Sequence, residues 1–158
     1  MIIMGIDPGI AITGWGVIQA HNRQPSCVDV GVITTQKTDP LEERLDILFT
    51  DMNQLLGRYR PDVVVLEQLF FNTNAKTALT VGHARGVIML AARKFGSQLF
   101  AYTPLQVKMA ITGYGRADKN QIQQMVTKLL KLDQIPQPDD AADALAIALT
   151  HGFSMRLN

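Results

Sequence analysis

Two acidic residues stand directly after short apolar segments of the sequence. Asp7 follows the apolar segment 1–6 and precedes the turn Pro8-Gly9, and Glu67 follows the apolar segment 63–66. Apolar runs of this length beside turn residues predict buried strands. The helix expected between them implies a crossover to a parallel strand, so both carboxylates should meet at one edge of a sheet.

Two carboxylates at one sheet edge repel each other, which raises their pKa values unless a cation lies between them. Oxygen ligands without a nearby His or Cys favour Mg²⁺ or Mn²⁺, so Asp7 and Glu67 are candidate metal ligands. Other roles stay open, because Asp7 could bond the backbone of its own turn and Glu67 could face water.

A further group of acids opens an alanine-rich segment near the end of the sequence. Its composition predicts a helix, on which Asp140 and Asp143 share a face and Asp139 serves as the cap. Acids in a first turn also favour the helix dipole, so a purely structural role for all three stays open. The apolar sequence around Asp143 would partly bury it, and a buried carboxylate needs a partner. A metal shared with Asp7 and Glu67 would supply one.

The net charge of +1 conceals a strong asymmetry along the chain. Residues 68–131 carry nine Lys or Arg and one acid, a net charge of +8, which leaves −7 for the remainder. This asymmetry predicts a basic surface beside an acidic region, and a polyanion such as nucleic acid is the expected partner. The alternative is a solvated, lysine-rich helical face.

Two adjacent aromatic residues, Phe70 and Phe71, follow Glu67 in a polar stretch. They cannot easily both point into the core, and an exposed ring beside a basic surface is suited to stacking on an unpaired base. The alternative is that both rings pack beneath the loop.

The elements that would position these residues follow from the apolar pattern. Three consecutive strands are predicted at 1–7, 12–18 and 28–35, and their short connections favour an antiparallel meander. Two further strands are expected at 62–67 and 98–102. Gly9, Gly14 and Gly16 crowd the first hairpin, where a ligand or another backbone could approach closely, or where bulges could form.

Helix signals separate and follow these strands. Asp39 as N-cap, with Pro40 at the first position, predicts an amphipathic helix that continues to Tyr59. Later helices are expected from about 74 to 95, from 104 to about 113, from 118 to 131 and from about 139 onward. Gly82 and Gly86 share a helical face and would permit close approach of the sheet or of a second subunit.

The bulk composition excludes several protein classes. A chain of 158 residues, 47% hydrophobic and 18% charged, is expected to form one globular domain. No run of 18 apolar residues predicts a membrane span, and no basic leader precedes the first strand. The single Cys27 allows no internal disulfide, so a reducing cytoplasm is the expected location.

Taken in order, these blocks resemble the RuvC family of Holliday junction resolvases. The resemblance covers nearly the whole chain. It is carried by Gly5-Ile6-Asp7-Pro8-Gly9, Glu67-Gln68-Leu69-Phe70, Gln106-Val107-Lys108, Lys119, and the run Asp140-Ala141-Ala142-Asp143-Ala144-Leu145-Ala146-Ile147-Ala148. Asp-Pro-Gly alone is a weak signal, whereas the ordered set is specific.

The resemblance implies an α/β protein with an RNase H-like fold, formed by residues 1–158 as a single nuclease domain. Its five-stranded mixed sheet would have strands 1–3 antiparallel, then parallel strands, with helices on the flanks. It also implies a cytoplasmic homodimer that binds a four-way DNA junction and nicks two opposing strands symmetrically in recombination and repair. The branch-migration proteins RuvA and RuvB are the further partners it implies.

The resemblance also assigns roles to individual residues. Asp7, Glu67, Asp140 and Asp143 match the family's metal-binding acids, for Mg²⁺ at two ions per subunit, with Mn²⁺ able to substitute. Lys108 and Lys119 match basic residues near the scissile bond, and both are expected to contact DNA. Phe70 matches the aromatic residue that engages junction bases, with Phe71 beside it. Further DNA contacts are expected from Lys76, Arg85 and Arg116.

Hydrolysis of a phosphodiester with two metal ions needs no Ser, Cys or His nucleophile, and none is evident. Three alternative functions make different demands on the chain. An actin-like sugar kinase or ATPase would need a second similar domain, for which 158 residues leave no room. Another RNase H-like nuclease would act on RNA or flaps. A non-enzymatic junction binder would gain nothing from acids that face phosphate.

Overall fold

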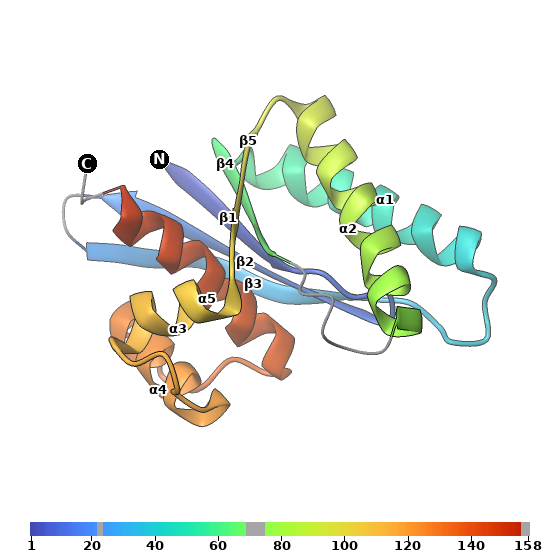
Figure 1. Ribbon diagram of the computed structural model, residues 1–158. Coiled ribbons are helices and arrows are strands. Elements are labelled where there is room, and N and C mark those ends of the chain that lie inside the picture. Colours follow the sequence, from blue (N-terminus) through green and yellow to red (C-terminus); the bar gives the residue numbers. More distant parts are fainter. Residues whose placement is uncertain (22–23, 69–74, 156–158) are drawn as a thin grey trace.

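The structure, a computed structural model, describes residues 1–21, 24–68 and 75–155. Five strands and five helices are assigned (Figure 1). In chain order they are β1 (Ile2–Asp7), β2 (Ile12–His21), β3 (Gln24–Thr34), α1 (Leu41–Tyr59), β4 (Val63–Glu67), α2 (Ala75–Phe95), β5 (Gln98–Tyr102), α3 (Pro104–Thr112), α4 (Lys119–Leu130) and α5 (Asp139–Ser154).

The strands form one mixed sheet in the order β3-β2-β1-β4-β5. β1, β2 and β3 pair antiparallel, whereas β1 pairs with β4 and β4 with β5 in parallel. The predicted meander and parallel crossover are therefore confirmed. The predicted start of the third strand at 28 is wrong, because its pairing with β2 continues past a register shift at Val17/Ile18 as far as His21 and Gln24.

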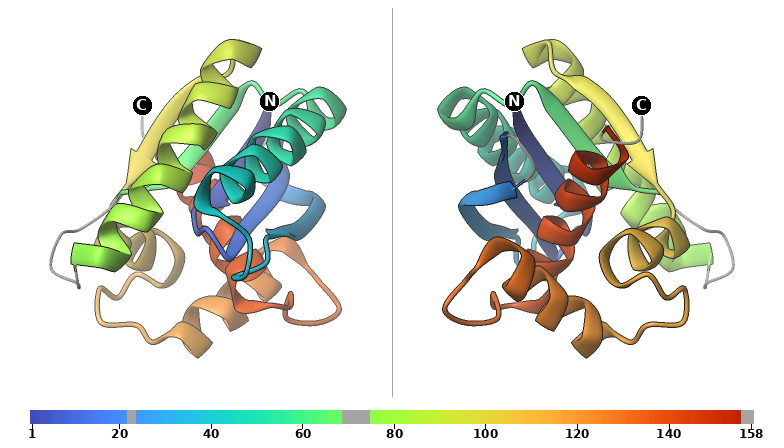
Figure 2. Two further views of the ribbon diagram at one scale, coloured as in Figure 1. Left: turned by 90° about the vertical axis from the view of Figure 1, so that its right-hand side faces the viewer. Right: turned by 90° about the vertical axis from the view of Figure 1, so that its left-hand side faces the viewer.

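Helices cover both faces of this sheet (Figure 2). Since side chains alternate along a strand, each strand contributes to two cores. Ile3 of β1 and Val65 of β4 pack with α3, α4 and α5 on one face. Met4 and Leu66 pack with α1 and α2 on the other. By the same alternation, the last residues of β1 and β4 point toward the α5 face.

The helix α5 lies unusually close to β1 and β2 because glycines face it. A Cβ atom on Gly5 would lie 2.1 Å from the carbonyl oxygen of Ala144, and one on Gly14 only 1.9 Å from that of Asp140. No side chain fits in that space. Of the two interpretations of the glycine-rich hairpin, close backbone approach is confirmed at Gly14, and the approaching backbone is the first turn of α5.

The helix starts differ in how they are capped. Thr103 and Asp118 cap α3 and α4 with reciprocal capping boxes that involve Gln106 and Gln121. The prediction for Asp39 is wrong, since Pro40 occupies the N-cap of α1 and makes no side-chain cap bond. Gly82 and Gly86 do not serve sheet packing, because a Cβ atom at either would meet nothing within 4 Å. No helix in the described part of the chain is long and apolar enough to cross a membrane.

Candidate active site

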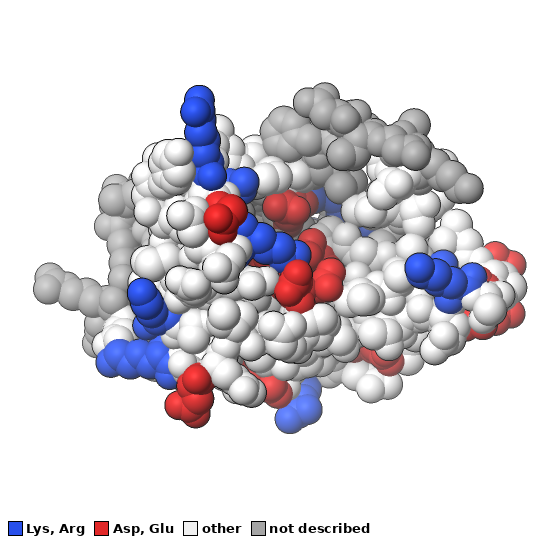
Figure 3. Space-filling model, turned by 90° about the horizontal axis from the view of Figure 1, so that it is seen from below, with Lys and Arg blue, Asp and Glu red and all other residues white. Residues whose placement is uncertain are grey.

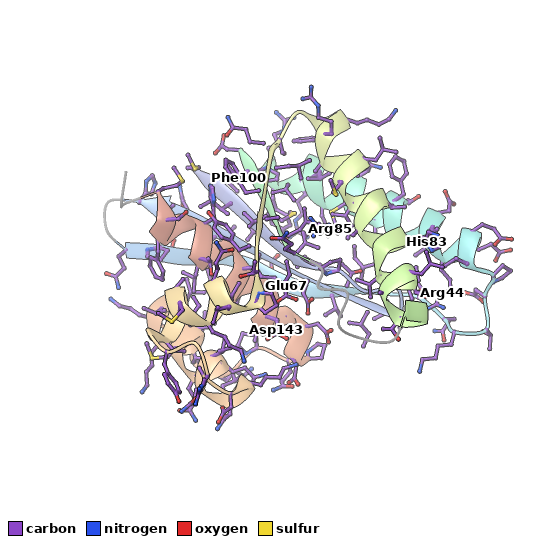
Figure 4. The ribbon with its side chains drawn as sticks, in the orientation of Figure 1. Arg44, Glu67, His83, Arg85, Phe100 and Asp143 are labelled. Carbon is purple, nitrogen blue, oxygen red and sulfur yellow. The ribbon has the colours of Figure 1, made fainter. Side chains whose placement is uncertain are left out.

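Asp7 and Glu67 end two neighbouring parallel strands, as the sequence predicted. Ile6 pairs with Leu66 in the parallel ladder, so the next residue of each strand reaches the same sheet edge. Both side chains point toward the α5 face and are only partly exposed. Figure 4 shows Glu67 at the end of β4 close to Asp143 of α5.

The first turn of α5 brings further acids to this edge. Asp143 lines a cavity together with Asp7 and Glu67. Asp140 instead lines a neighbouring groove, although its charge still raises the pKa of Asp7. Because Gly14 pairs with Asp7 in the sheet and contacts the Asp140 backbone, the glycine fixes how close α5 comes to β1.

The cavity is a hollow of about 200 Å³ between the sheet edge and helices α3, α4 and α5. Lys108 from α3 and Lys119 from α4 also line it. Apolar residues such as Val107 and Ile122 form its walls. The site therefore combines three acids and two lysines in a hollow with partly apolar walls.

The carboxylates of the cavity make one another harder to ionise. Burial, with the negative charges of Glu67, Asp143 and Asp140, raises the pKa of Asp7 to about 7, while Lys119 opposes the shift. Burial and Asp143 raise the pKa of Glu67. Burial also raises the pKa of Asp143, although Lys119 acts against it. Uncompensated negative charge is thus concentrated at this edge.

Lys119 is the principal counter-charge. Its Nζ lies 3.1 Å from Asp139 Oδ2 and 3.2 Å from Asp143 Oδ2. Figure 3 shows acidic side chains gathered in a hollow near the middle of one face, with a basic side chain directly against them. The prediction that Asp139 caps α5 is wrong, because Pro138 holds the N-cap position and Asp139 pairs with Lys119.

The chemistry of the donor set fits a divalent cation. The acids offer only oxygen ligands, which suit Mg²⁺ or Mn²⁺, and the raised pKa values mark a charge that a cation would neutralise. Among the described residues, however, no three His, Cys, Asp or Glu side chains are already grouped to hold a metal ion.

The other residues predicted to contact DNA do not line the cavity or lie outside the described residues. Arg85 of α2 donates a hydrogen bond to the carbonyl oxygen of Glu67, so it contacts the end of β4. Figure 4 shows Arg85 and Glu67 in that region. Arg116 is exposed between α3 and α4 and lines neither the cavity nor the groove. Lys76 lies in the first turn of α2, but its side chain, like Phe70 and Phe71, lies outside the described residues.

One residue beside the site was missed by the sequence reasoning. Lys37, from the connection between β3 and α1, lines the groove that also contains Asp140. The groove has a volume of about 750 Å³ and runs past the first hairpin to the start of α2, where Thr77 lines it. No local signal marks Lys37, because only the folded hairpin brings it near α5.

Comparison with known proteins gives a consistent result. The family model described as crossover junction endodeoxyribonuclease RuvC matches residues 3–151. A crossover junction endodeoxyribonuclease RuvC of Ruminiclostridium cellulolyticum is 54% identical over 157 residues, which cover 99% of this chain and 95% of that protein.

Two solved structures are closely similar to this chain. The structure of RuvC from Thermus thermophilus has a TM-score of 0.92 at 38% identity, covering 99% of this chain and 96% of that chain. RuvC from the same organism in complex with a Holliday junction substrate also has a TM-score of 0.92, at 35% identity, covering 100% of this chain and 97% of that chain.

Proposed function

The chain belongs to the RuvC family of crossover junction endodeoxyribonucleases, nucleases that resolve Holliday junctions in DNA, and we propose that it cuts at the cavity of Asp7, Glu67 and Asp143. The observation that carries the proposed site is the convergence of these acids, from β1, β4 and α5, at one sheet edge. Their oxygen donors and the raised pKa of Asp7 suit a site that binds divalent cations and a phosphate.

The proposed reaction is hydrolysis of a phosphodiester. A water oxygen bonds to phosphorus, the bond from phosphorus to the 3′ oxygen breaks, and the leaving oxygen takes up a proton. Two Mg²⁺ ions held by Asp7, Glu67, Asp140 and Asp143 would activate the water and stabilise the leaving oxygen, and Mn²⁺ can substitute. The four acids are proposed to hold the ions, and Lys108 and Lys119 to stabilise charge on the phosphate.

The path of the DNA strand follows from the two hollows beside α5. An endonuclease cuts inside a strand, so the strand must continue on both sides of the scissile phosphate. The cavity lies on one side of the α5 acids, where Lys119 and Lys108 line it. We propose that the groove of Asp140 and Lys37 takes the strand on the other side.

Two opposing strands must be nicked, which we propose a homodimer does with one site in each subunit. The outer face of α2 suits a dimer contact, because it carries small and apolar residues at helical spacing. Leu79 and Leu90 are 65% and 52% exposed, and a Cβ atom at Gly82 or Gly86 would meet none of the described atoms within 4 Å. A cytoplasmic location and cooperation with the branch-migration proteins RuvA and RuvB complete the proposal.

A panel of labelled substrates tests this function. The protein with Mg²⁺ is incubated with a four-way junction, a duplex, a fork and an RNA–DNA hybrid, each labelled at one end. We expect paired nicks at symmetry-related positions in the junction alone, and no cleavage in EDTA. Preferential cleavage of the hybrid or the fork would instead support an RNase H-like nuclease that acts on RNA or flaps.

The variant Asp7→Asn separates binding from cleavage in the same assay. It removes one oxygen ligand from the site while keeping the size of the side chain, so junction binding should persist and cleavage should fall by at least about 100-fold. Undiminished cleavage by this variant would contradict the proposed site.

A further inference from the structure

Helices α4 and α5 meet beside the cavity through four polar side chains. Lys119 and Gln123 lie four residues apart on α4, and Asp139 and Asp143 lie four apart on α5, so each pair shares one face of its helix. Lys119 Nζ contacts both carboxylates, at 3.1 Å and 3.2 Å. Gln123 is buried and its Nε2 donates to Asp139 Oδ1 at 3.1 Å. Asp139 is thus held by two residues of α4, through one oxygen each.

The two carboxylates that share Lys119 differ in what else they face. Asp143 lines the cavity with Asp7 and Glu67, whereas Asp139 does not line it. A divalent cation in the cavity would need an oxygen of Asp143, and the ammonium of Lys119 already lies against that carboxylate. Because the two positive charges repel, the cation and the lysine compete for Asp143.

We propose that Asp139 is a positioning residue that retains Lys119 at the rim of the cavity when a divalent cation takes Asp143. The inference rests on the proposed cation-dependent function. Asp139 is a second partner already at contact distance, so Lys119 gives up one of two contacts rather than its only one. The lysine then stays beside the entering phosphate instead of turning into solvent, where its half-exposed side chain could otherwise go.

Binding of Mn²⁺ alone to the metal-free protein, measured by titration calorimetry, tests the competition. Lys119→Met removes the competing charge and should tighten Mn²⁺ binding about two- to fivefold, the range expected for a partly exposed ion pair. Asp139→Asn leaves Lys119 with Asp143 alone and should weaken Mn²⁺ binding by a similar factor.

The double variant isolates the positioning role from simple loss of charge. A negative charge at residue 139 attracts Mn²⁺ equally whether or not Lys119 is present. We therefore expect Asp139→Asn to weaken binding at least about twofold more in the wild-type background than in the Lys119→Met background. Equal effects in the two backgrounds would overturn the inference.

Three further variants distinguish the specific contacts of Asp139 from a general loss of negative charge. Asp133→Asn removes the same charge from an exposed position between α4 and α5. Its Mn²⁺ affinity should stay within about twofold of the wild-type value. Gln123→Leu removes the donor to Asp139 without touching a charge and should act in the same direction as Asp139→Asn, more weakly. Asp139→Glu keeps the charge and should restore most of the wild-type affinity.

The wild-type titration separates the two hypotheses. If Mn²⁺ binds the wild type and Asp7→Asn abolishes that binding, the proposed site stands and only the coupling between Asp139 and Lys119 is under test. If the wild type binds no Mn²⁺, the cation-dependent function fails, and the inference fails with it.

Discussion

Asp7 occupies a position that is useful for chemistry and costly for folding. Its pKa of about 7, against an ordinary 3.8, means that ionising this carboxylate inside the folded protein is unfavourable, first because of burial and then because of Glu67, Asp143 and Asp140. A divalent cation would offset that cost. Without one, the same charge destabilises the fold.

Asp7→Asn should therefore stabilise the metal-free protein. The unfolded chain ionises Asp7 from about pH 4, whereas the folded protein resists ionisation until about pH 7. The gain should thus be absent below pH 4, grow between pH 4 and 7 and level off above, at roughly 2–4 kcal/mol or about 5–10 °C in Tm. Thermal unfolding in EDTA at pH 5 and pH 8 measures it.

The matched control is Asp46→Asn, the same change at an exposed position of α1, which should shift Tm by less than about 2 °C at either pH. An equal gain at pH 5 and pH 8, or a loss of stability on Asp7→Asn, would contradict the charge argument. With saturating Mg²⁺ present, the advantage of the variant should shrink, since the wild type then gains binding free energy that the variant lacks.

The positions of individual residues were predicted well where local pattern determines them. Asp7 and Glu67 end strands β1 and β4, Asp140 and Asp143 lie near the start of α5, and the electrostatic effect of the other three acids on Asp7 reflects their proximity. Asp139 was misassigned because an acid before a helix can either cap it or pair across to another helix. That choice depends on Lys119, whose position is set by tertiary packing.

The position of Lys37, in the connection between β3 and α1, could not be predicted from the sequence. Its contact with the groove depends on how the β3–α1 connection folds past the first hairpin, which no periodicity reveals. Lys37→Gln should weaken junction binding about three- to tenfold and lower the slope of log affinity against log salt by about one, with kcat nearly unchanged. Binding titrations at several salt concentrations measure this.

Lys94→Gln provides the control for Lys37. Lys94 is exposed in the last turn of α2, at the far end of that helix from the groove (Figure 1). Its substitution should therefore leave the slope of log affinity against log salt unchanged. If both variants lower affinity equally, the effect is one of net charge and the groove does not hold the strand.

The contact of α5 with the sheet sets the geometry of the acids. Gly14→Ala would place a methyl group 1.9 Å from the Asp140 carbonyl oxygen, so the first turn of α5 must move. We expect a loss of about 1–3 kcal/mol in stability from overpacking. Cleavage should fall by about 100-fold, because a shift of about 1 Å misplaces the acids. Chemical denaturation and junction cleavage measure the two effects separately.

Gly57→Ala is the corresponding control, since Gly57 lies in α1 and a Cβ atom there meets nothing within 4 Å. It should stabilise the protein by about 0.5–1 kcal/mol, because alanine is the better helix former, and leave cleavage unchanged. If Gly14→Ala behaves like this control, the close approach of α5 does not position the site.

At the level of elements, sequence signals succeeded where the partner is local. The predicted starts of the helices near residues 104 and 118 are confirmed, and Thr103 and Asp118 fix them by bonding to residues three positions on. The Asp39 signal failed because the helix begins one residue later and Pro40 takes the cap. The glycine-rich hairpin indicated that something approaches closely, but the identity of α5 as the neighbour is a non-local fact.

At the scale of the whole molecule, the proposed paired nicks require two such sites on one junction. The outer face of α2 is the surface we propose for this, and its apolar residues are exposed in the single chain, with Met89 at 39% beside Leu90 at 52%. Small residues on a helix face allow a second helix to approach closely. A large side chain at such a position blocks the contact without disturbing its own subunit.

Gly86→Leu tests this surface because Gly86 is exposed and a Cβ atom there would meet no described atom within 4 Å. We expect an intact fold of equal or greater thermal stability, with the dimer dissociation constant raised at least tenfold by light scattering or sedimentation. Since two sites are needed for paired nicks, the variant should nick junctions singly at concentrations where the wild type resolves them. Gly57→Leu on α1 is the matched control and should remain dimeric. A Gly86→Leu protein that stays dimeric and resolves junctions would place the subunit contact on another surface.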